Sequence, residues 1–477
     1  MKNTIILLLL AVTGFSYAQE KKDSTLVFKK RVLDATEVDF ASSYYNQNGN
    51  HAAVSGGLGT EKLSDFATNI VVATPLNDDD VLTFDIGVSA YTSASSSNVN
   101  PFPTSSSSTG ASGQTTEVLA SNPKGTPWQA SSGASRKGDL YALNASYSHS
   151  SNDRNFIWNA DVALSTEFNY SSRGLGGGIT RLFNEKNSEI SIKVNAYFDN
   201  WKIIYPTELN EYNSYGNSFL TSGHFKGVIV YDKDGNQSNL YRPSTFQPWN
   251  STVRDSYSSS ISFSQIVSKR MQFSLFFDLL QQQGMLSTPY QRMYFADKQH
   301  FFIGDKQFIP VYQSSSNTGV YELADDIERL PSKRFKLPIG LRWNYFINEK
   351  ATVRTYYRYY QDDWGVKGHT FNIELPIKIN DLYTVYPMYR YYVQTQSKFF
   401  APFEQHLSTE QYYTSDYDLS AFSANQYGLG ATYTDLLEKF SIFGLGLKNI
   451  DFRFNHYTRT DGLSANIGTI AFKFLAN

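Results

Sequence analysis

Sixteen segments of this sequence alternate apolar and polar residues over about 10 to 15 positions each. In one of them, Leu82, Phe84 and Ile86 alternate with Thr83 and Asp85. A period of two is the period of a β-strand with one apolar and one polar face. The segments exceed the roughly 5–6 residues of a typical globular strand, whereas a tilted strand needs about 9–11 residues to cross a bilayer. The alternation therefore predicts an all-β fold, a transmembrane antiparallel β-barrel of about 16 strands.

The expected strands are distributed along most of the chain. They are placed at residues 35–48, 62–75, 79–94, 137–150, 154–169, 172–184, 188–203, 253–267, 271–284, 333–347, 351–363, 368–379, 382–397, 423–435, 438–457 and 462–475. The segment at 172–184 fits this pattern least well, because it is rich in glycine and glycine weakens a strand.

The connections between these segments are sorted by length. Short polar turns follow every even-numbered segment, and one of them is expected at Leu437-Glu438-Lys439. Long connections follow odd-numbered segments and are expected near 95–136, 204–252, 285–332 and 398–422. Outer-membrane barrels have this asymmetry, with short periplasmic turns and long extracellular loops, whereas a secreted β-sandwich gives no reason for it.

The N-terminus has the pattern of a cleaved secretory signal. A positive charge at Lys2 precedes an apolar stretch at 5–12, and small residues end at Ala18. The apolar stretch is too short to span a membrane; an ordinary N-terminal core helix is the alternative. The expected organisation is a signal peptide at 1–18, a periplasmic N-terminal segment at 19–34 and an outer-membrane β-barrel at 35–477.

Composition agrees with an exported barrel. The chain has no cysteine, so it makes no disulfide bonds and its stability must come from the fold itself. The mean hydropathy of −0.39 is compatible with a membrane barrel, because apolar and polar faces alternate and average out. A net charge of −2 gives no electrostatic signature of nucleic-acid binding.

The polar faces of the strands predict which charges line the lumen. If the apolar face contacts lipid, the opposite face carries Asp39, Asp85, Asp161 and Asp278 on earlier strands and Lys336, Arg342, Arg354, Arg358 and Arg390 on later strands. In a water-filled pore these charges would create a transverse field. The alternative is that they pair and fill a closed lumen, since an unpaired buried charge is costly. About sixteen strands enclose more space than strand side chains alone can fill, as in porins, which favours a channel or a loop-plugged barrel.

Two functional hypotheses follow. The first is an outer-membrane channel or transport component for small polar solutes, and the second is a non-conducting scaffold that presents its extracellular loops to a partner protein or surface ligand. The connection at 285–332 bears on both, because it contains Tyr290, Tyr294, Phe301 and Phe302 and is too apolar for a free coil. It would fold inward as a constriction, form a ligand or partner surface, or pack as a cap on the barrel mouth.

Catalytic and metal-binding motifs are absent from the sequence. There is no GxSxG, HExxH, Walker-type or CxxC pattern, and the seven histidines do not have ligand spacing on one element. The triplet at 78–80 is acidic and could bind a cation, although acidic turns are usually only solvated. We therefore expect no catalytic residue, no cofactor and no metal. A surface-loop hydrolase with a Ser–His pair is a third and less favoured hypothesis.

Four stretches near the N-terminus carry a family resemblance. They are VLDATEVDF at 32–40, GLGTEKLSD at 57–65, PLNDDDVL at 75–82 and SAYTSASSSN at 89–98. With them the chain resembles the uncharacterised Bacteroidetes outer-membrane family catalogued as domain of unknown function 3570, over nearly all of its length after the signal. The resemblance implies contact with outer-membrane lipid. It also implies an envelope lipoprotein or a flavin-linked redox partner, and it supplies no site residues.

Overall fold

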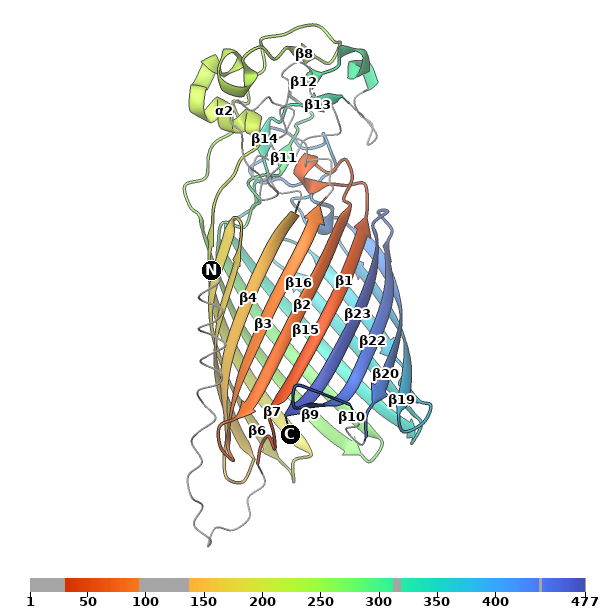
Figure 1. The fold of residues 1–477 in the computed structure, drawn as a ribbon. Helices are drawn as coiled ribbons and strands as arrows, with labels where there is room; N and C mark the ends of the chain where they lie inside the picture. The colour runs from red at the N-terminus through yellow and green to blue at the C-terminus, as the bar shows by residue number, and fades with distance from the viewer. Residues whose placement is uncertain (1–30, 94–136, 312–318, 437–439, 477) are drawn as a thin grey trace.

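A closed antiparallel barrel forms the body of the molecule, seen in a computed structural model that describes residues 31–93, 137–311, 319–436 and 440–476 (Figure 1). Its wall consists of sixteen strands: β1 (Glu37–Asn48), β2 (Leu63–Pro75), β3 (Asp80–Ser93), β4 (Lys137–Ser150), β5 (Phe156–Glu167), β6 (Tyr170–Phe183), β7 (Ser188–Trp201), β9 (Val253–Ser268), β10 (Met271–Gly284), β15 (Lys333–Asn348), β16 (Ala351–Asp362), β17 (Lys367–Glu374) continued by β18 (Ile377–Lys378), β19 (Tyr383–Gln394), β20 (Phe422–Thr434), β22 (Leu445–Arg459) and β23 (Ser464–Ala476). Each strand pairs with its neighbours in the chain, and β1 pairs with β23 to close the ring. The predicted fold class is confirmed.

The two faces of each strand meet different surroundings. Along β5, Val162 and Leu164 are exposed on one face, whereas Asp161 between Ala160 and Val162 is buried on the other. Arg453 of β22 reaches Glu374 of β17 with its Nη1 3.4 Å from Oε2, although β19 and β20 lie between these strands. Side chains meet across two intervening strands only on the concave side of the wall. The polar faces therefore point into the lumen and the apolar faces point outward.

The glycine-rich strand β6 is explained by its neighbours. A Cβ atom at Gly174 would collide with the ring of Tyr197 on β7, and one at Gly176 would collide with the carboxylate of Asp161 on β5. Both glycines face the lumen, so they give larger side chains of the adjacent strands room to lie across β6. The least regular segment of the sequence is thus a full wall strand at 170–183.

One end of the barrel carries tight turns. They lie at 76–79, 151–155, 184–187, 269–270, 349–350 and 379–382. The last connection at this end differs, because β21 (Ser441–Ile442) pairs with the start of β22 and forms a small separate hairpin. The wall strand predicted to begin at 438 therefore begins at Leu445, and that boundary prediction is wrong. The turn predicted at 437–439 lies outside the described residues.

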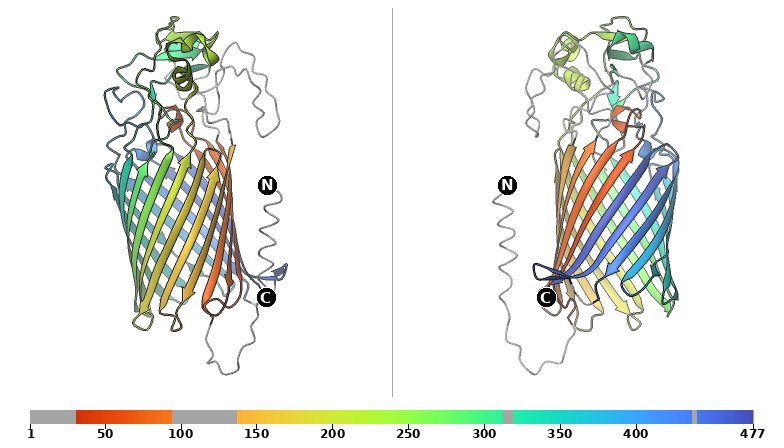
Figure 2. Two further views of the ribbon diagram at one scale, coloured as in Figure 1. Left: turned by 90° about the vertical axis from the view of Figure 1, so that its left-hand side faces the viewer. Right: turned by 45° about the vertical axis from the view of Figure 1, so that its right-hand side comes forward.

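The other end carries a compact unit above the barrel mouth, which we name the cap (Figure 2). It is built from the connections 49–62, 202–252, 285–332 and 395–421, as far as these are described. Its elements are η2 (Ala53–Ser55), α2 (Thr207–Tyr215), η4 (Gly216–Thr221), η5 (Gly223–Phe225), β8 (Val230–Asp232), β11 (Arg292–Met293), β12 (Phe301–Gly304), η6 (Lys306–Val311), β13 (Val320–Glu322), β14 (Asp326–Ile327) and η7 (Tyr417–Leu419). Strands β8, β12 and β13 form one small sheet, and β11 and β14 form another.

The cap has its own hydrophobic core. One cluster joins Phe219 and Phe225 to Phe301 and Ile303, so residues of the connection 202–252 pack on residues of 285–332. Three further clusters continue this core through the cap. Among the three fates considered for the aromatic connection 285–332, the structure shows packing as a cap on the barrel mouth.

Two parts of the predicted organisation lie outside the description. Residues 1–30 include the expected signal peptide and most of the expected periplasmic segment, and residues 94–136 include the first long connection. Within the described ranges, no helix has the length and apolar character needed to cross a membrane.

Candidate functional site: the barrel lumen

The nine charged residues predicted to line the lumen share one face of the wall. Paired residues of neighbouring strands lie on the same face, so the register can be followed round the ring from Glu374 and Arg453. This register puts on the inner face Asp39, Asp85, Asp161, Asp278, Lys336, Arg342, Arg354, Arg358 and Arg390.

Basic side chains are concentrated on one arc of the lumen, from β15 to β22. Arg354 donates from Nη1 to Oε1 of Glu374 at 3.0 Å, and Arg453 donates from Nε to Oδ1 of Asp451 at 3.0 Å. Arg342 instead lies over the ring of Phe276, with its guanidinium carbon 5.6 Å from the ring centre. The arc is therefore only partly neutralised by carboxylates.

Acidic side chains are concentrated on the opposite arc, from β1 to β5. Asp85 accepts a hydrogen bond from the side-chain amide of Asn69 at 2.7 Å, and Asp161 lies 3.8 Å from Nζ of Lys193. Asp278 departs from this division, because β10 pairs directly with β15 and carries Asp278 to the edge of the basic arc. The acidic residues of β1 to β5 therefore lie across the ring from the basic arc, whereas Asp278 lies beside it.

Several charged side chains on the inner face of the wall are not covered by other side chains. The inward side chains of Arg354, Lys193 and Arg453 are 57%, 51% and 46% exposed. In a barrel filled by its own side chains, groups on the concave face would be buried. A hollow of about 200 Å³ also lies against the inner wall of β1 to β4, where the lining side chains are small, as at Ala67 and Ala142.

A serine ladder on β9 was missed by the sequence reasoning. Every second residue of this strand faces the lumen, and five of these inward residues in succession are serine: Ser256, Ser258, Ser260, Ser262 and Ser264. Asn195 donates to the hydroxyl of Ser258 at 3.2 Å, and Ser264 lies within 2.8 Å of Ser274 Oγ. The signal was present as alternating serines in the sequence, but attention to charge alone passed over these neutral groups.

The cap is attached to the rim of the lumen. Arg459, at the end of β22, donates to Oδ1 of Asp418 at 2.6 Å and to the carbonyl of Tyr417 at 2.8 Å. The ring of Tyr417 stacks on His51 with 3.7 Å between centroids, so two connections of the cap meet above the end of β22. These contacts hold the cap over this end of the lumen.

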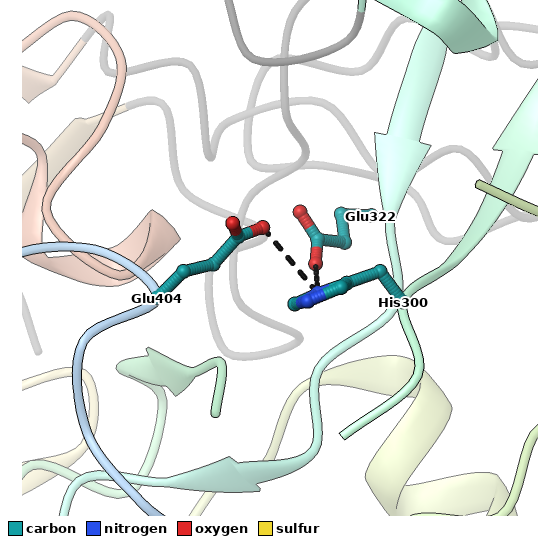
Figure 3. Close-up of side chains that lie close together, drawn as sticks. All are labelled: His300, Glu322 and Glu404. Carbon is teal, nitrogen blue, oxygen red and sulfur yellow. Dashed lines mark hydrogen bonds and ion pairs between the residues drawn. The ribbon is translucent and has the colours of Figure 1, made fainter. Parts of the chain in front are cut away.

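Only one group of three side chains suited to a metal ion was found in the described residues, and it lies in the cap (Figure 3). It consists of His300, Glu322 and Glu404. Sequence reasoning could not find it, because His300 and Glu404 come from different connections and meet only when the cap folds.

Comparison with known proteins gives a family but no activity. The family described as "Protein of unknown function (DUF3570)" matches residues 5–471, which confirms the resemblance stated from the sequence. No curated protein matches the chain.

Several solved outer-membrane proteins are similar in fold. They include a bacterial polysaccharide outer membrane secretin (TM-score 0.39, 9% identity, 92% of this chain and 99% of that chain), Pseudomonas aeruginosa OccK1 (0.36, 7%, 93% and 98%) and a mutant of the TodX monoaromatic hydrocarbon channel (0.39, 10%, 94% and 91%).

Proposed function

The chain belongs to the DUF3570 family, whose description names no function, and we propose that it is an outer-membrane channel or transport component for small polar solutes. The observation that carries the proposal is the exposure of charged side chains on the concave face of the wall, with Arg354, Lys193 and Arg453 about half exposed. Charged groups of this kind keep their hydration only beside water. A hydrated lumen inside a sixteen-stranded wall is the property that a diffusion channel needs.

The outer face supports a location in a membrane. Its apolar side chains, such as Val162, Leu175 and Leu429, are more than half exposed and would be unfavourable in water. Trp158 and Trp343 are also exposed on this face, near the end with tight turns, where aromatic side chains suit a membrane interface. On this proposal the cap end is extracellular and the turn end is periplasmic.

The lumen chemistry suggests the class of solute. An acidic arc, a basic arc and a neutral serine ladder line one water-accessible space, so a small polar solute with both signs of charge or with hydroxyl groups would find partners on all sides. An apolar solute would find few. Solute class therefore follows from the polarity of the wall rather than from any single binding residue.

Reconstitution in planar bilayers tests the proposal. The refolded protein is expected to give discrete conductance steps, and Arg390→Glu is expected to shift ion selectivity toward cations because it removes an exposed positive charge from the basic arc. The matched control is Lys233→Glu, which makes the same charge change on the exposed surface of the cap. An absence of conductance steps from correctly folded protein would eliminate the open channel.

The second candidate function is a non-conducting scaffold that presents the cap to a partner. The observation in its favour is the cap itself, because loops that only border a pore do not need four hydrophobic clusters. Folded protein that is silent in bilayers but whose cap is required for capture of a surface ligand would favour this function.

A further inference from the structure

The cap brings together three side chains that can coordinate a metal ion. Nδ1 of His300 lies 2.7 Å from Oε1 of Glu322 and 3.3 Å from Oε1 of Glu404. The three potential ligand atoms all lie within 4.8 Å of one another, and Figure 3 shows the side chains converging from separate backbone segments.

The three residues come from separate parts of the cap. His300 lies directly before β12, and Glu322 ends β13, which pairs with β12 so that Phe302 is opposite Glu322. Glu404 comes from the connection 395–421, at a backbone φ of 54°, which non-glycine residues rarely adopt. The paired strands fix two ligands on a rigid base, and a tight turn of another connection supplies the third.

The residue types select a class of ion. An imidazole nitrogen and carboxylate oxygens are all groups that bind Zn²⁺ and similar ions, and three protein ligands leave a fourth position for water. Ca²⁺ prefers six to eight oxygen ligands, so a histidine and only two carboxylates suit it poorly. Tetrahedral bonds of about 2.0–2.2 Å put ligand atoms about 3.3–3.6 Å apart, which His300 and Glu404 already satisfy at 3.3 Å. Glu322 needs to withdraw from His300 by less than about 1 Å.

The local charge also favours a cation. Glu322 and Glu404 face a single histidine, and the carboxylate of Asp325 acts electrostatically on both Glu322 and His300, whereas Lys298 acts on Asp325. Among these groups, three carboxylates therefore stand against one histidine and one lysine.

We propose that His300, Glu322 and Glu404 bind a divalent transition-metal ion of the Zn²⁺ class, which links the connection 285–332 to the connection 395–421. The side chains are only 10% to 16% exposed, so the ion would be held within the cap while one edge of the cluster stays open to solvent. This site is independent of conduction through the lumen.

The competing explanation is a protonated histidine that joins two glutamates without any metal. Both explanations place His300 at the centre of the cluster, so loss of stability on mutation would not separate them. Direct measurement of bound metal separates the two explanations, because only the proposal requires one bound ion per chain.

The test uses the full-length folded protein in detergent, stripped with a chelator and dialysed. Titration with ZnCl2 at pH 7, followed by calorimetry and by elemental analysis after gel filtration, is expected to give one ion per chain. Co²⁺ in its place is expected to give the visible absorption of a tetrahedral site. The conservative variant Glu404→Gln and the variant His300→Ala are each expected to weaken Zn²⁺ binding at least tenfold.

The matched control is His149→Ala. His149 also lies 2.6 Å from a carboxylate, that of Asp80, but no third ligand completes a metal group there in the described part of the chain. This variant is expected to bind Zn²⁺ as tightly as the natural sequence. The proposal is overturned if folded protein binds less than a stoichiometric amount of Zn²⁺, if Ca²⁺ or Mg²⁺ binds more tightly, or if Glu404→Gln binds Zn²⁺ unchanged.

Discussion

Apolar side chains have opposite surroundings in the barrel wall and in the cap. On the wall, Leu175 and Val162 are more than half exposed on the outside, while charged and hydroxyl groups face the lumen. In the cap, Phe219 and Ile303 are fully buried, as in a small water-soluble domain. Within the strands, apolar side chains therefore face outward and polar side chains face inward. Within the long connections, apolar side chains face inward instead.

The two regions also depend on different forces. The wall is a continuous ring of paired strands in which backbone groups satisfy one another, and this is what a bilayer demands of a spanning structure. All four hydrophobic clusters found in the described residues belong to the cap. We infer that the cap unfolds at lower cost than the wall and that substitutions can affect it separately.

The largest expected difference between the regions comes from removing an arginine. Arg292 and Glu208 form a fully buried pair in the cap, with Nε 2.9 Å from Oε1 and exposures of 1% and 0%. Arg292→Ala leaves the carboxylate buried without its partner and should destabilise the cap by about 3–5 kcal/mol. Hydrogen exchange, read separately on cap and wall amides, measures this effect.

The matched substitution in the lumen is Arg354→Ala. Arg354 also pairs with a glutamate, but its side chain remains exposed to water, so the loss should be below about 1 kcal/mol. Equal losses of stability from Arg292→Ala and Arg354→Ala would contradict the conclusion that the first pair is shielded from water and the second is not.

A smaller difference is expected when an exposed apolar residue becomes arginine. Val162 on the wall is 52% exposed and Leu240 in the cap is 67% exposed, but their proposed surroundings are lipid and water. Val162→Arg should cost about 2–4 kcal/mol in reversible unfolding from lipid vesicles, because the charge would lie near the middle of the bilayer. Leu240→Arg should stay within about 0.5 kcal/mol. Similar costs at both positions would argue that the outer face does not contact lipid.

The smallest expected effect is a pH dependence confined to the cap. Glu328 is buried there and accepts hydrogen bonds from Thr414 Oγ1 at 2.5 Å and from the backbone of Thr288 at 2.7 Å. Burial raises the pKa of Glu328 to about 8, assisted by the nearby charge of Asp416. In the unfolded chain a glutamate has a pKa of about 4.3. Between these values the folded cap holds a proton that the unfolded chain has released.

The stabilising contribution of Glu328 is therefore complete below about pH 4.3 and is lost as the pH rises toward about 8. The slope is at most about 1.4 kcal/mol per pH unit, and a loss of about 2 kcal/mol between pH 5 and about pH 6.5 is expected. Limited proteolysis of the cap over this range measures the loss, with SDS resistance of the barrel as the reference. Glu328→Gln should flatten the curve, and an unchanged slope in that variant would assign the effect to other groups.

The sequence allowed prediction of the wall because each strand is a local pattern. Alternation sets the two faces, tight turns join neighbours, and the order of pairing follows the order of the chain. The inward glycines of β6 also recur with a period of two. The sequence did not predict their role, because it depends on Tyr197 and Asp161 of the neighbouring strands, which lie across them. The small hairpin of β21 was missed because two paired residues carry no periodic signal.

The cap could not be predicted in the same way. Its strands are two to four residues long, and β8 pairs with β12 although they belong to different connections. Its aromatic content indicated burial but not the partner of each ring. The grouping of His300 with Glu404 likewise depends on a tertiary contact between two connections, so no spacing along the chain could reveal it.

The pairing of β1 with β23 sets the timing of assembly. Glu37 is opposite Leu475 and Asn48 is opposite Ser464. One edge of β1, the first strand of the wall, therefore stays unpaired until β23, the last strand, pairs with it. Until then both ends of the growing sheet present unpaired backbone groups, which readily recruit strands of other chains. A nascent or truncated chain thus has no partly sealed intermediate in which to wait. During delivery to the membrane, both open edges of the sheet must be shielded from other chains. They no longer need shielding once β1 has paired with β23.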